Sequence, residues 1–221
     1  MQEKVNKLLT GEYEFSDSTN IQAKTSVTEV THNSQDRIIE VTKEPKFMEK
    51  TKKLTSSEIG TLMHLIMQEL DFSKTYDKSS VEELINSLIF RKKITEEEAK
   101  YINKNSIISF SNCNLYKEIQ AAKQIEKEKP FYIFLDSSEV YKTKVKEEIL
   151  VQGIIDLYFI NKDDEIVLVD YKTDYANGKN ELIEKYKPQL EIYKKALEQS
   201  LGKKVSKTYI YSLYLNKEIE L

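Results

Sequence analysis

The chain has 221 residues, with 34 Lys and Arg against 37 Asp and Glu, so its formal net charge is −3. This length is enough for one domain with a buried core, which the 14 Tyr and 8 Phe help to fill, and a wholly disordered chain is excluded. The single cysteine excludes an internal disulfide, a zinc site of several thiolates and a cysteine-held iron–sulfur cluster, and the five glycines form no Walker-type ATP site.

Residues 1–54 are predicted to form an N-terminal arm or linker that is partly extended. Between residues 16 and 53 the chain is rich in Thr, Ser, Lys and Glu, and we expect only a short ordered piece, at Ser26 to Val30. The first residues lack the hydrophobic segment of a secretion signal, and the long apolar runs are interrupted by polar residues. We therefore expect a cytoplasmic protein without a membrane span.

A series of helices is predicted after residue 54. Thr55 and Glu58 have the spacing of a capping box, and apolar residues then recur at helical spacing as far as Leu70. Three further helices are expected, at Val81 to Phe90, at Thr95 to about Ile108 and at Leu115 to Lys127. These helices would form an N-terminal helical part of the domain.

Strands are predicted in the next part of the chain. The patterns indicate strands at Phe131–Leu135, Glu148–Ile160 and Ile166–Tyr171, with a turn at residues 161–164. A helix is expected from about Asn180 to Leu201, with a break at Pro188 and a C-cap at Gly202, followed by a last strand from Lys207 to Leu215. This order predicts an α/β core, with residues 55–221 as one domain.

The hairpin between the two long strands carries the strongest indication of chemistry. Asp170 and Lys172 are two residues apart on a strand, so their side chains share one face. If Asn161 faces Glu165 across the turn, Asp156 lies opposite Asp170, with the Cβ atoms roughly 5 Å apart. Two carboxylates this close repel each other unless a cation lies between them, and Mg²⁺ prefers oxygen ligands. The pattern therefore predicts a metal-assisted phosphodiesterase, in which Lys172 orients the attacking water or stabilises the transition state.

An Asp-x-Lys triplet alone is also compatible with an ion pair at the end of a strand. Similar triplets, with Glu as the acid, occur at residues 44–46 and 98–100, where we interpret them as surface charges. The hypothesis therefore depends on other motifs of the chain.

Five short segments carry such motifs, and in chain order they are Gly60-Thr-Leu-Met-His64, Lys127-Glu-Lys-Pro-Phe131, Gly153-Ile-Ile-Asp156, Asp170-Tyr-Lys-Thr173 and Gln189-Leu-Glu-Ile-Tyr193. Together they resemble the GTxxH, acidic, GxxD, DYKT and QxxxY elements of the RecB-type exonucleases, which belong to the PD-(D/E)xK superfamily. In the acidic element, Lys127 and Lys129 stand where the family usually has Arg and Val. The resemblance covers roughly residues 55–215. Within the family, the string from Leu150 to Asp156, and Gln189-x-x-x-Tyr193 after a DYKTD segment, are most similar to the C-terminal nuclease domain of AddA-type helicase–nuclease subunits.

The resemblance implies a restriction-endonuclease-like (PD-(D/E)xK) fold, an α/β core with a mixed central sheet flanked by helices, preceded by an N-terminal helical part and an extended arm. It also implies a Mg²⁺ or Mn²⁺ site without an iron–sulfur cluster, whose ligands are His64, Asp156, Asp170 and the carbonyl of Tyr171. Without the resemblance, His64 is equally compatible with a histidine that is satisfied in the core.

The implied catalytic residues are Asp156, Asp170, Lys172, Gln189 and Tyr193. Gln189 and Tyr193 are one helical turn apart and would contact the scissile phosphate or a metal-bound water, although a polar helix face with a core tyrosine also explains them. Glu128 would hold a water or orient Lys172, or else belong to a solvated run of charges.

Positive charge gathers near this proposed site. Residues 171–207 contain nine Lys and five acidic residues, a net charge of +4, which leaves −7 for the remainder. Lys179, Lys185 and Lys187 are expected to bind DNA together with Gln189 and Tyr193. A lysine-rich solvated helix explains the count about as well.

The resemblance as a whole implies a metal-dependent DNA exonuclease that acts on DNA ends or single strands. It would be the nuclease domain of an AddAB-type helicase–nuclease in double-strand break repair and recombination. The expected partners are single-stranded DNA, the helicase part of AddA and an AddB-like subunit, since this chain has no ATP site. One alternative is a non-catalytic nuclease-like module that binds DNA or packs against a helicase. Another is a different phosphoesterase on the same metal scaffold, such as an RNA or nucleotide hydrolase.

Overall fold

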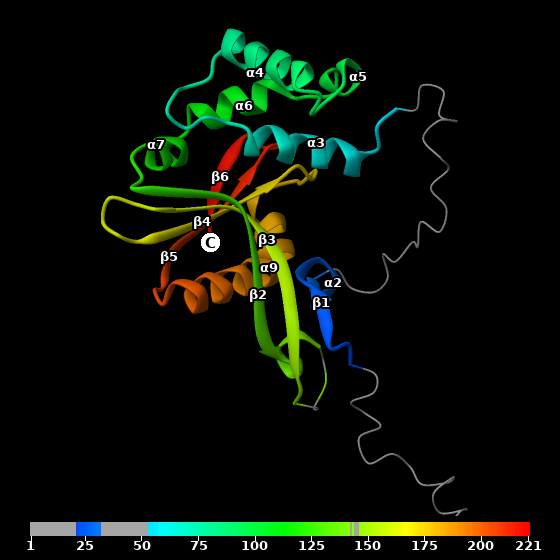
Figure 1. Ribbon diagram of the computed structural model, residues 1–221, viewed down its shortest axis with the longest axis vertical. Helices are drawn as coiled ribbons and strands as arrows, with labels where there is room; N and C mark the ends of the chain where they lie inside the picture. Colours follow the sequence, from blue (N-terminus) through cyan, green and yellow to red (C-terminus); the bar gives the residue numbers. More distant parts are fainter. Residues whose placement is uncertain (1–20, 32–52, 142, 144–145) are drawn as a thin grey trace, which may run out of the picture.

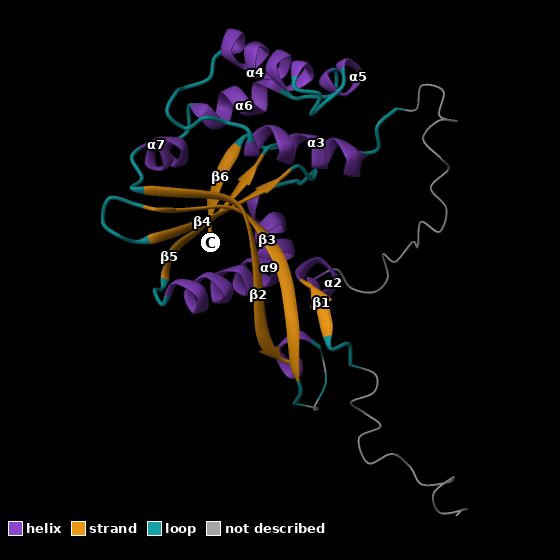
Figure 2. Ribbon diagram, viewed as in Figure 1, coloured by secondary structure: helices purple, strands orange, loops and turns teal. Residues whose placement is uncertain are grey.

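The computed structural model describes residues 21–31, 53–141, 143 and 146–221. In this part of the chain a six-stranded mixed sheet forms the middle layer, and helices cover both of its faces (Figure 1; Figure 2). The predicted α/β core with a mixed sheet between helices is confirmed. Most of the arm expected at residues 1–54 lies outside the described residues.

The long strand β3 (Glu148–Ile160) lies at the centre of the sheet. One edge of β3 pairs antiparallel with β2 (Gln124–Asp136). Its other edge pairs in parallel with β1 (Lys24–Ser26) as far as residue 152 and, from residue 157, antiparallel with β4 (Ile166–Lys172). Residues 153–156 therefore lie between the two pairings, and Asp156 is the last of them.

The sheet continues from β4 to the C-terminal strands. β5 (Val205–Ser212) runs parallel to β4, and β6 (Lys217–Glu220) pairs antiparallel with β5. The predicted last strand at Lys207–Leu215 is therefore confirmed with its start two residues earlier and its end three residues earlier. The strand β6 was not predicted, because its four residues are too few for a clear alternation.

Helices α3 to α7 cover one face of the sheet (Figure 1). The predicted capping box is confirmed at α3 (Ser56–Gln68), where the backbone N–H of Glu58 donates to Thr55 Oγ1 at 3.3 Å. The buried residues of α4 (Lys78–Phe90) join the same core as the buried residues of α3. Apolar residues of these helices form one core with the sheet residues Leu157, Phe159, Val167 and Val169.

Two predicted helix boundaries in this layer are wrong. The helix expected from Thr95 to Ile108 is divided into α5 (Glu96–Ala99) and α6 (Lys104–Ser111), because Asn103 starts a new helix by accepting the Ser106 backbone N–H at 3.2 Å. The helix expected as far as Lys127 ends earlier, as α7 (Asn114–Gln120). Residues from 124 onward pair with β3 instead, and this pairing overrides their local helix propensity.

Helix α9 (Lys179–Leu201) covers the other face of the sheet. It runs through Pro188 as one helix, so the predicted break is wrong; buried residues before and after the proline, Leu182 and Leu190, hold both halves on the same core. The predicted C-cap is confirmed, since Gly202 has a φ of 65°. Within the described residues, no helix is both long and apolar enough to cross a membrane.

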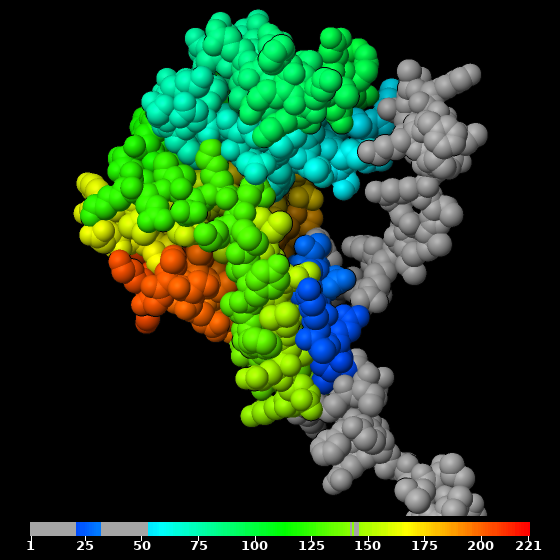
Figure 3. Space-filling view, in the orientation of Figure 1, coloured from blue at the N-terminus to red at the C-terminus, as the bar shows by residue number. Residues whose placement is uncertain are grey.

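The ordered piece expected at Ser26 to Val30 is the end of β1 followed by α2 (Val27–Thr31). It lies beside the N-terminal part of β3 (Figure 3). Val27 is buried there. A Cβ on Gly153 would lie 3.2 Å from Val27 Cγ2 and 2.7 Å from Phe131 Cε1. Only glycine at position 153 leaves room for these two side chains to meet over β3. The helix α8 (Ser137–Val140) follows β2 at this end of the molecule.

Candidate active site

The β3–β4 hairpin has the predicted register. The Asn161 backbone N–H donates to the Glu165 carbonyl at 2.9 Å, and the pairs continue to Leu157 opposite Val169. Extended by one residue beyond this last pair, the register would place Asp156 opposite Asp170 on the same face, as predicted. At this point the strands are joined through a side chain, because the Tyr171 backbone N–H donates to Asp156 Oδ2 at 2.8 Å.

His64 reaches the same point from the helical layer. Its Nδ1 lies 3.4 Å from Asp156 Oδ1, and its side chain is 31% exposed. Burial lowers the pKa of His64, but the hydrogen bond to Asp156 and the charges of Asp156 and Asp170 outweigh it, so the pKa is raised above its ordinary value. The pKa of the imidazole therefore depends on the negative charge of both carboxylates.

Asp170 is a buried carboxylate with an ammonium beside it. The residue is 1% exposed, and Lys172 Nζ lies 2.7 Å from Asp170 Oδ2. Burial and the charge of Asp156 raise the pKa of Asp170 to about 6, although Lys172 opposes this shift. Lys172 Nζ also lies 4.4 Å from the centre of the Tyr186 ring, which holds the ammonium in place. Burial is the largest of these effects, and the opposing effect of Lys172 is larger than the effect of Asp156.

These donors fit a hard divalent cation. Two carboxylates, an imidazole and the carbonyl of Tyr171 offer the oxygen and nitrogen atoms that Mg²⁺ and Mn²⁺ accept. The set is not a closed cage, since among the described residues no three His, Cys, Asp or Glu side chains are already arranged to hold an ion. The Tyr171 side chain is buried in the helical core, so only its backbone is available to the site.

Gln189 and Tyr193 lie together on α9. Gln189 Nε2 donates to the Tyr193 hydroxyl at 2.8 Å. The Tyr193 ring meets the Phe131 ring edge to face, with 5.5 Å between centroids. Burial and the charges of Asp170, Asp156 and Glu128 raise the pKa of Tyr193, so its hydroxyl keeps its proton. Because its oxygen accepts from Gln189, this hydroxyl can donate its proton to another acceptor.

The three predicted DNA-binding lysines lie in the first half of α9. Lys179 is its first residue, and Lys187 follows eight residues later on the exposed surface. Lys185 forms an ion pair with Asp174 at 3.1 Å, so its charge is partly offset. None of the three is among the contacts found for Asp156 or Asp170 in the described residues.

Sequence reasoning did not identify Tyr186, and it gave Glu128 only a secondary role. Tyr186 supports Lys172 and donates its hydroxyl to Asp174. It precedes Gln189 by three and Tyr193 by seven residues, so helical spacing could have placed it on the same face. Glu128 lies on β2 between the residues that pair with Leu157 and Ile155 and has a φ of 48°; burial and the charge of Asp156 raise its pKa. A positive φ in a non-glycine strand residue has no signature in the sequence.

The chain is similar to known nuclease sequences along most of its length. Residues 36–219 match the family model described as "PD-(D/E)XK nuclease superfamily". Two relatives bear the name of the A subunit of an "ATP-dependent helicase/nuclease": that of Thermoanaerobacter sp. (strain X514), 40% identical over 231 residues, and that of Clostridium novyi (strain NT), 34% identical over 236 residues. The alignments cover 97% and 99% of this chain but 19% of each relative, so the chain spans about a fifth of their length.

Among solved structures, one described as "Crystal structure of SSO0001" aligns with 100% of this chain and 72% of its own, with a TM-score of 0.36 and 11% identity. The family match and the named relatives confirm the predicted resemblance to RecB-type nucleases and to the A subunits of helicase–nucleases. Since the matched region includes all five motifs, the chain belongs to the PD-(D/E)XK nuclease superfamily.

Proposed function

We propose that the chain is a Mg²⁺- or Mn²⁺-dependent deoxyribonuclease, an exonuclease that hydrolyses phosphodiester bonds. The observation that carries this proposal is the convergence of His64, Asp156, Asp170 and Lys172 at one end of the β3–β4 hairpin. Membership of a nuclease superfamily supports the reaction class. Residues 55–221 would be the nuclease domain, with residues 1–54 as its arm.

His64, Asp156, Asp170 and the carbonyl of Tyr171 would hold the cation, which supplies positive charge at the phosphate and a water of lowered pKa. Asp156 is oriented in advance, since the Tyr171 N–H and His64 contact its two carboxylate oxygens. This leaves little reorganisation for the binding step.

Lys172 would act on the reacting phosphate. Its ammonium is held between Asp170 and the Tyr186 ring, where it would donate to the attacking water or to a phosphate oxygen that gains charge. The Tyr193 hydroxyl, which keeps its proton, would donate to a second phosphate oxygen. Gln189 would fix the orientation of that hydroxyl.

The proposed substrate is DNA, at its ends or as single strands, and Lys179, Lys185 and Lys187 would contact its backbone. The relatives bear the name of an ATP-dependent helicase/nuclease subunit, and this name supports a DNA substrate. The chain corresponds to about a fifth of their length, so most of each relative lies outside the matched region. We therefore propose two partners, the helicase part of AddA and an AddB-like subunit, with a role in double-strand break repair and recombination in the cytoplasm.

Cleavage of end-labelled single-stranded DNA, duplex DNA and RNA in Mg²⁺, Mn²⁺ or EDTA tests the proposal. DNA should be cleaved only with a divalent ion, and Asp170→Asn should abolish cleavage. Asp163→Asn is the matched control, since Asp163 is an exposed carboxylate in the hairpin turn. Equal cleavage by wild type and Asp170→Asn would contradict the proposal.

The competing proposal is a non-catalytic nuclease-like module. Two observations favour it: Lys172 already contacts Asp170, and the described residues hold no ready set of three metal-binding side chains. A module of this kind should bind DNA without a stoichiometric Mn²⁺ site.

A further inference from the structure

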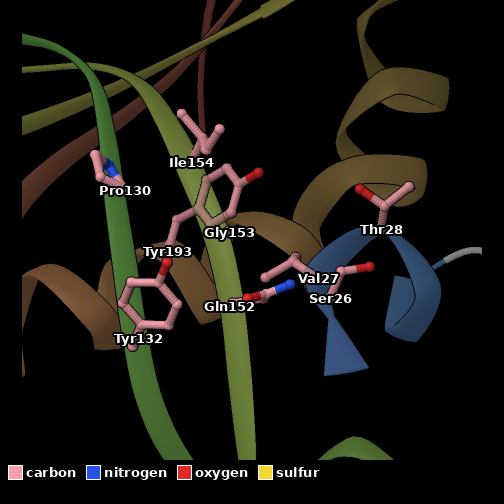
Figure 4. A pocket seen from close by; sticks show the side chains of 9 residues that line it. All are labelled: Ser26, Val27, Thr28, Pro130, Tyr132, Gln152, Gly153, Ile154 and Tyr193. Atoms are coloured by element: carbon pink, nitrogen blue, oxygen red, sulfur yellow. The ribbon is translucent and has the colours of Figure 1, made fainter. Parts of the chain in front are cut away.

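A pocket of about 470 Å³ opens between β2, β3, α9 and the β1–α2 segment (Figure 4). Every residue that lines it is uncharged. The lining includes Tyr132 of β2, Gln152 and Ile154 of β3, Tyr193 of α9, and Ser26 and Thr28 of β1 and α2. Its volume is in the range of pockets that bind small molecules.

The pocket adjoins the candidate active site. Tyr193 lines the pocket, and its hydroxyl is close enough to Asp156 and Asp170 for their charges to raise its pKa. Ile154 precedes Asp156 by two residues on β3, a distance of about 7 Å along the strand. A group in the pocket is therefore about one nucleotide from a phosphate at the two carboxylates.

The chemistry of the pocket suits a base better than a phosphate. Tyr132 is 64% exposed and Ile154 is 51% exposed, so both offer apolar surface that is not used in the core. The amide of Gln152 and the hydroxyls of Ser26 and Thr28 can exchange hydrogen bonds with the edge of a base. A phosphate would instead favour a lining with Lys or Arg.

We propose that this pocket receives a nucleobase of the DNA strand whose phosphate lies at Asp156 and Asp170. Tyr132 stacks on the base, and Gln152 contacts its edge. The inference rests on the proposed function, because it takes DNA as the substrate of the same site. Stacking on an aromatic side chain is tolerant of sequence, as a nuclease that degrades strands requires.

The first test compares two exposed aromatic residues of β2. Tyr132 and Phe134 are two residues apart on one face, and they are 64% and 63% exposed, but only Tyr132 lines the pocket. In a fluorescence anisotropy titration of the full chain with a labelled single-stranded oligonucleotide in EDTA, Tyr132→Ala should raise the Kd about 5- to 150-fold. Tyr132→Phe and Phe134→Ala should stay within about twofold of wild type. Equal effects of Tyr132→Ala and Phe134→Ala, including no effect of either, would overturn the proposal.

The second test moves a single abasic nucleotide along the oligonucleotide. One position should weaken binding by wild type and leave binding by Tyr132→Ala unchanged, because the base and the ring form one contact. If Tyr132→Ala weakens binding but no such position exists, Tyr132 contacts the backbone and the base pocket is wrong.

Cleavage in Mn²⁺ separates this inference from the proposed function. If wild type cleaves DNA but Tyr132→Ala binds DNA as tightly as wild type, only the proposed base pocket is wrong. If both binding results are obtained but wild type does not cleave DNA, the proposed nuclease activity is wrong and the base pocket is supported. Wild type that binds no DNA overturns both.

Discussion

Gly60 of α3 lies against Thr173 at the end of the DYKT motif, so that a Cβ on Gly60 would be 3.0 Å from Thr173 Oγ1. This close approach joins two motifs that are far apart in the sequence. His64 is one helical turn beyond Gly60, and the approach brings its imidazole to Asp156. The glycine of the GTxxH motif is thus explained by packing.

Gly60→Ala should lower metal-dependent cleavage while the fold is retained. Alanine in a helix stabilises by about 0.5–1 kcal/mol relative to glycine, but its Cβ would push α3 and His64 away from β4 by a few tenths of an ångström. Thr173→Ala removes the opposing oxygen, so the double variant should regain part of the activity. Cleavage rates and thermal unfolding of both variants check this; a double variant no better than Gly60→Ala would speak against the packing account.

Lys172→Ala should lower the turnover number about 10²- to 10³-fold, because it removes a donor that faces the reacting phosphate. Mn²⁺ affinity near pH 8 should not fall, since Lys172 is not a ligand and its ammonium competes with the cation for Asp170. Single-turnover kinetics and calorimetry measure the two quantities separately. Loss of Mn²⁺ binding in this variant would mean that Lys172 has been assigned the wrong role.

Glu69→Gln should destabilise the fold in a pH-dependent way without affecting the chemistry. Partial burial raises the pKa of Glu69, but Lys93 and Arg91 outweigh it and leave the pKa lowered from 4.5. A lowered pKa stabilises the fold above pH 4.5, and this contribution is lost as the pH falls through the folded-state value. Near pH 7 the variant should lose roughly 2–4 °C in Tm, and the difference should shrink in acid. Thermal unfolding between pH 3 and 7 tests this, and a difference that grows toward acid would contradict it.

Lys187→Ala should weaken DNA binding and reduce the salt dependence of log Kd by about 0.7, as expected for one lost phosphate contact to a single strand. Lys203→Ala is the control, since Lys203 is an exposed lysine beyond the opposite end of α9. Binding titrations at several salt concentrations give both slopes. The same change in the two variants would indicate a general charge effect in place of a binding surface.

The hairpin and the caps could be predicted because their signals are local. Turn residues from Asn161 onward specify the β3–β4 register, and Thr55 and Gly202 mark helix ends through contacts with their own neighbours in the chain. From that register the facing positions of Asp156 and Asp170 follow directly. The meeting of His64 with Asp156 was available only through the resemblance to a known family.

The errors arise where a distant partner decides the local structure. Residues 124–127 have a helical composition, but they pair with β3, which follows more than twenty residues later. α9 tolerates Pro188 because its buried face is held on both sides of the proline. The pocket beside Tyr193 combines Ser26, Tyr132 and Gln152, so it exists only once β1, β2 and β3 are assembled.

The central claim is that Asp156 and Asp170 form one cation site with His64, and calorimetric titration with Mn²⁺ tests it most directly. Wild type and the turn variant Asp163→Asn should each bind Mn²⁺ at a stoichiometric site. Asp156→Asn and Asp170→Asn should each weaken that binding at least about tenfold, because each removes a charged oxygen ligand. Mn²⁺ binding that is the same in all four proteins, or absent from wild type, would contradict the account.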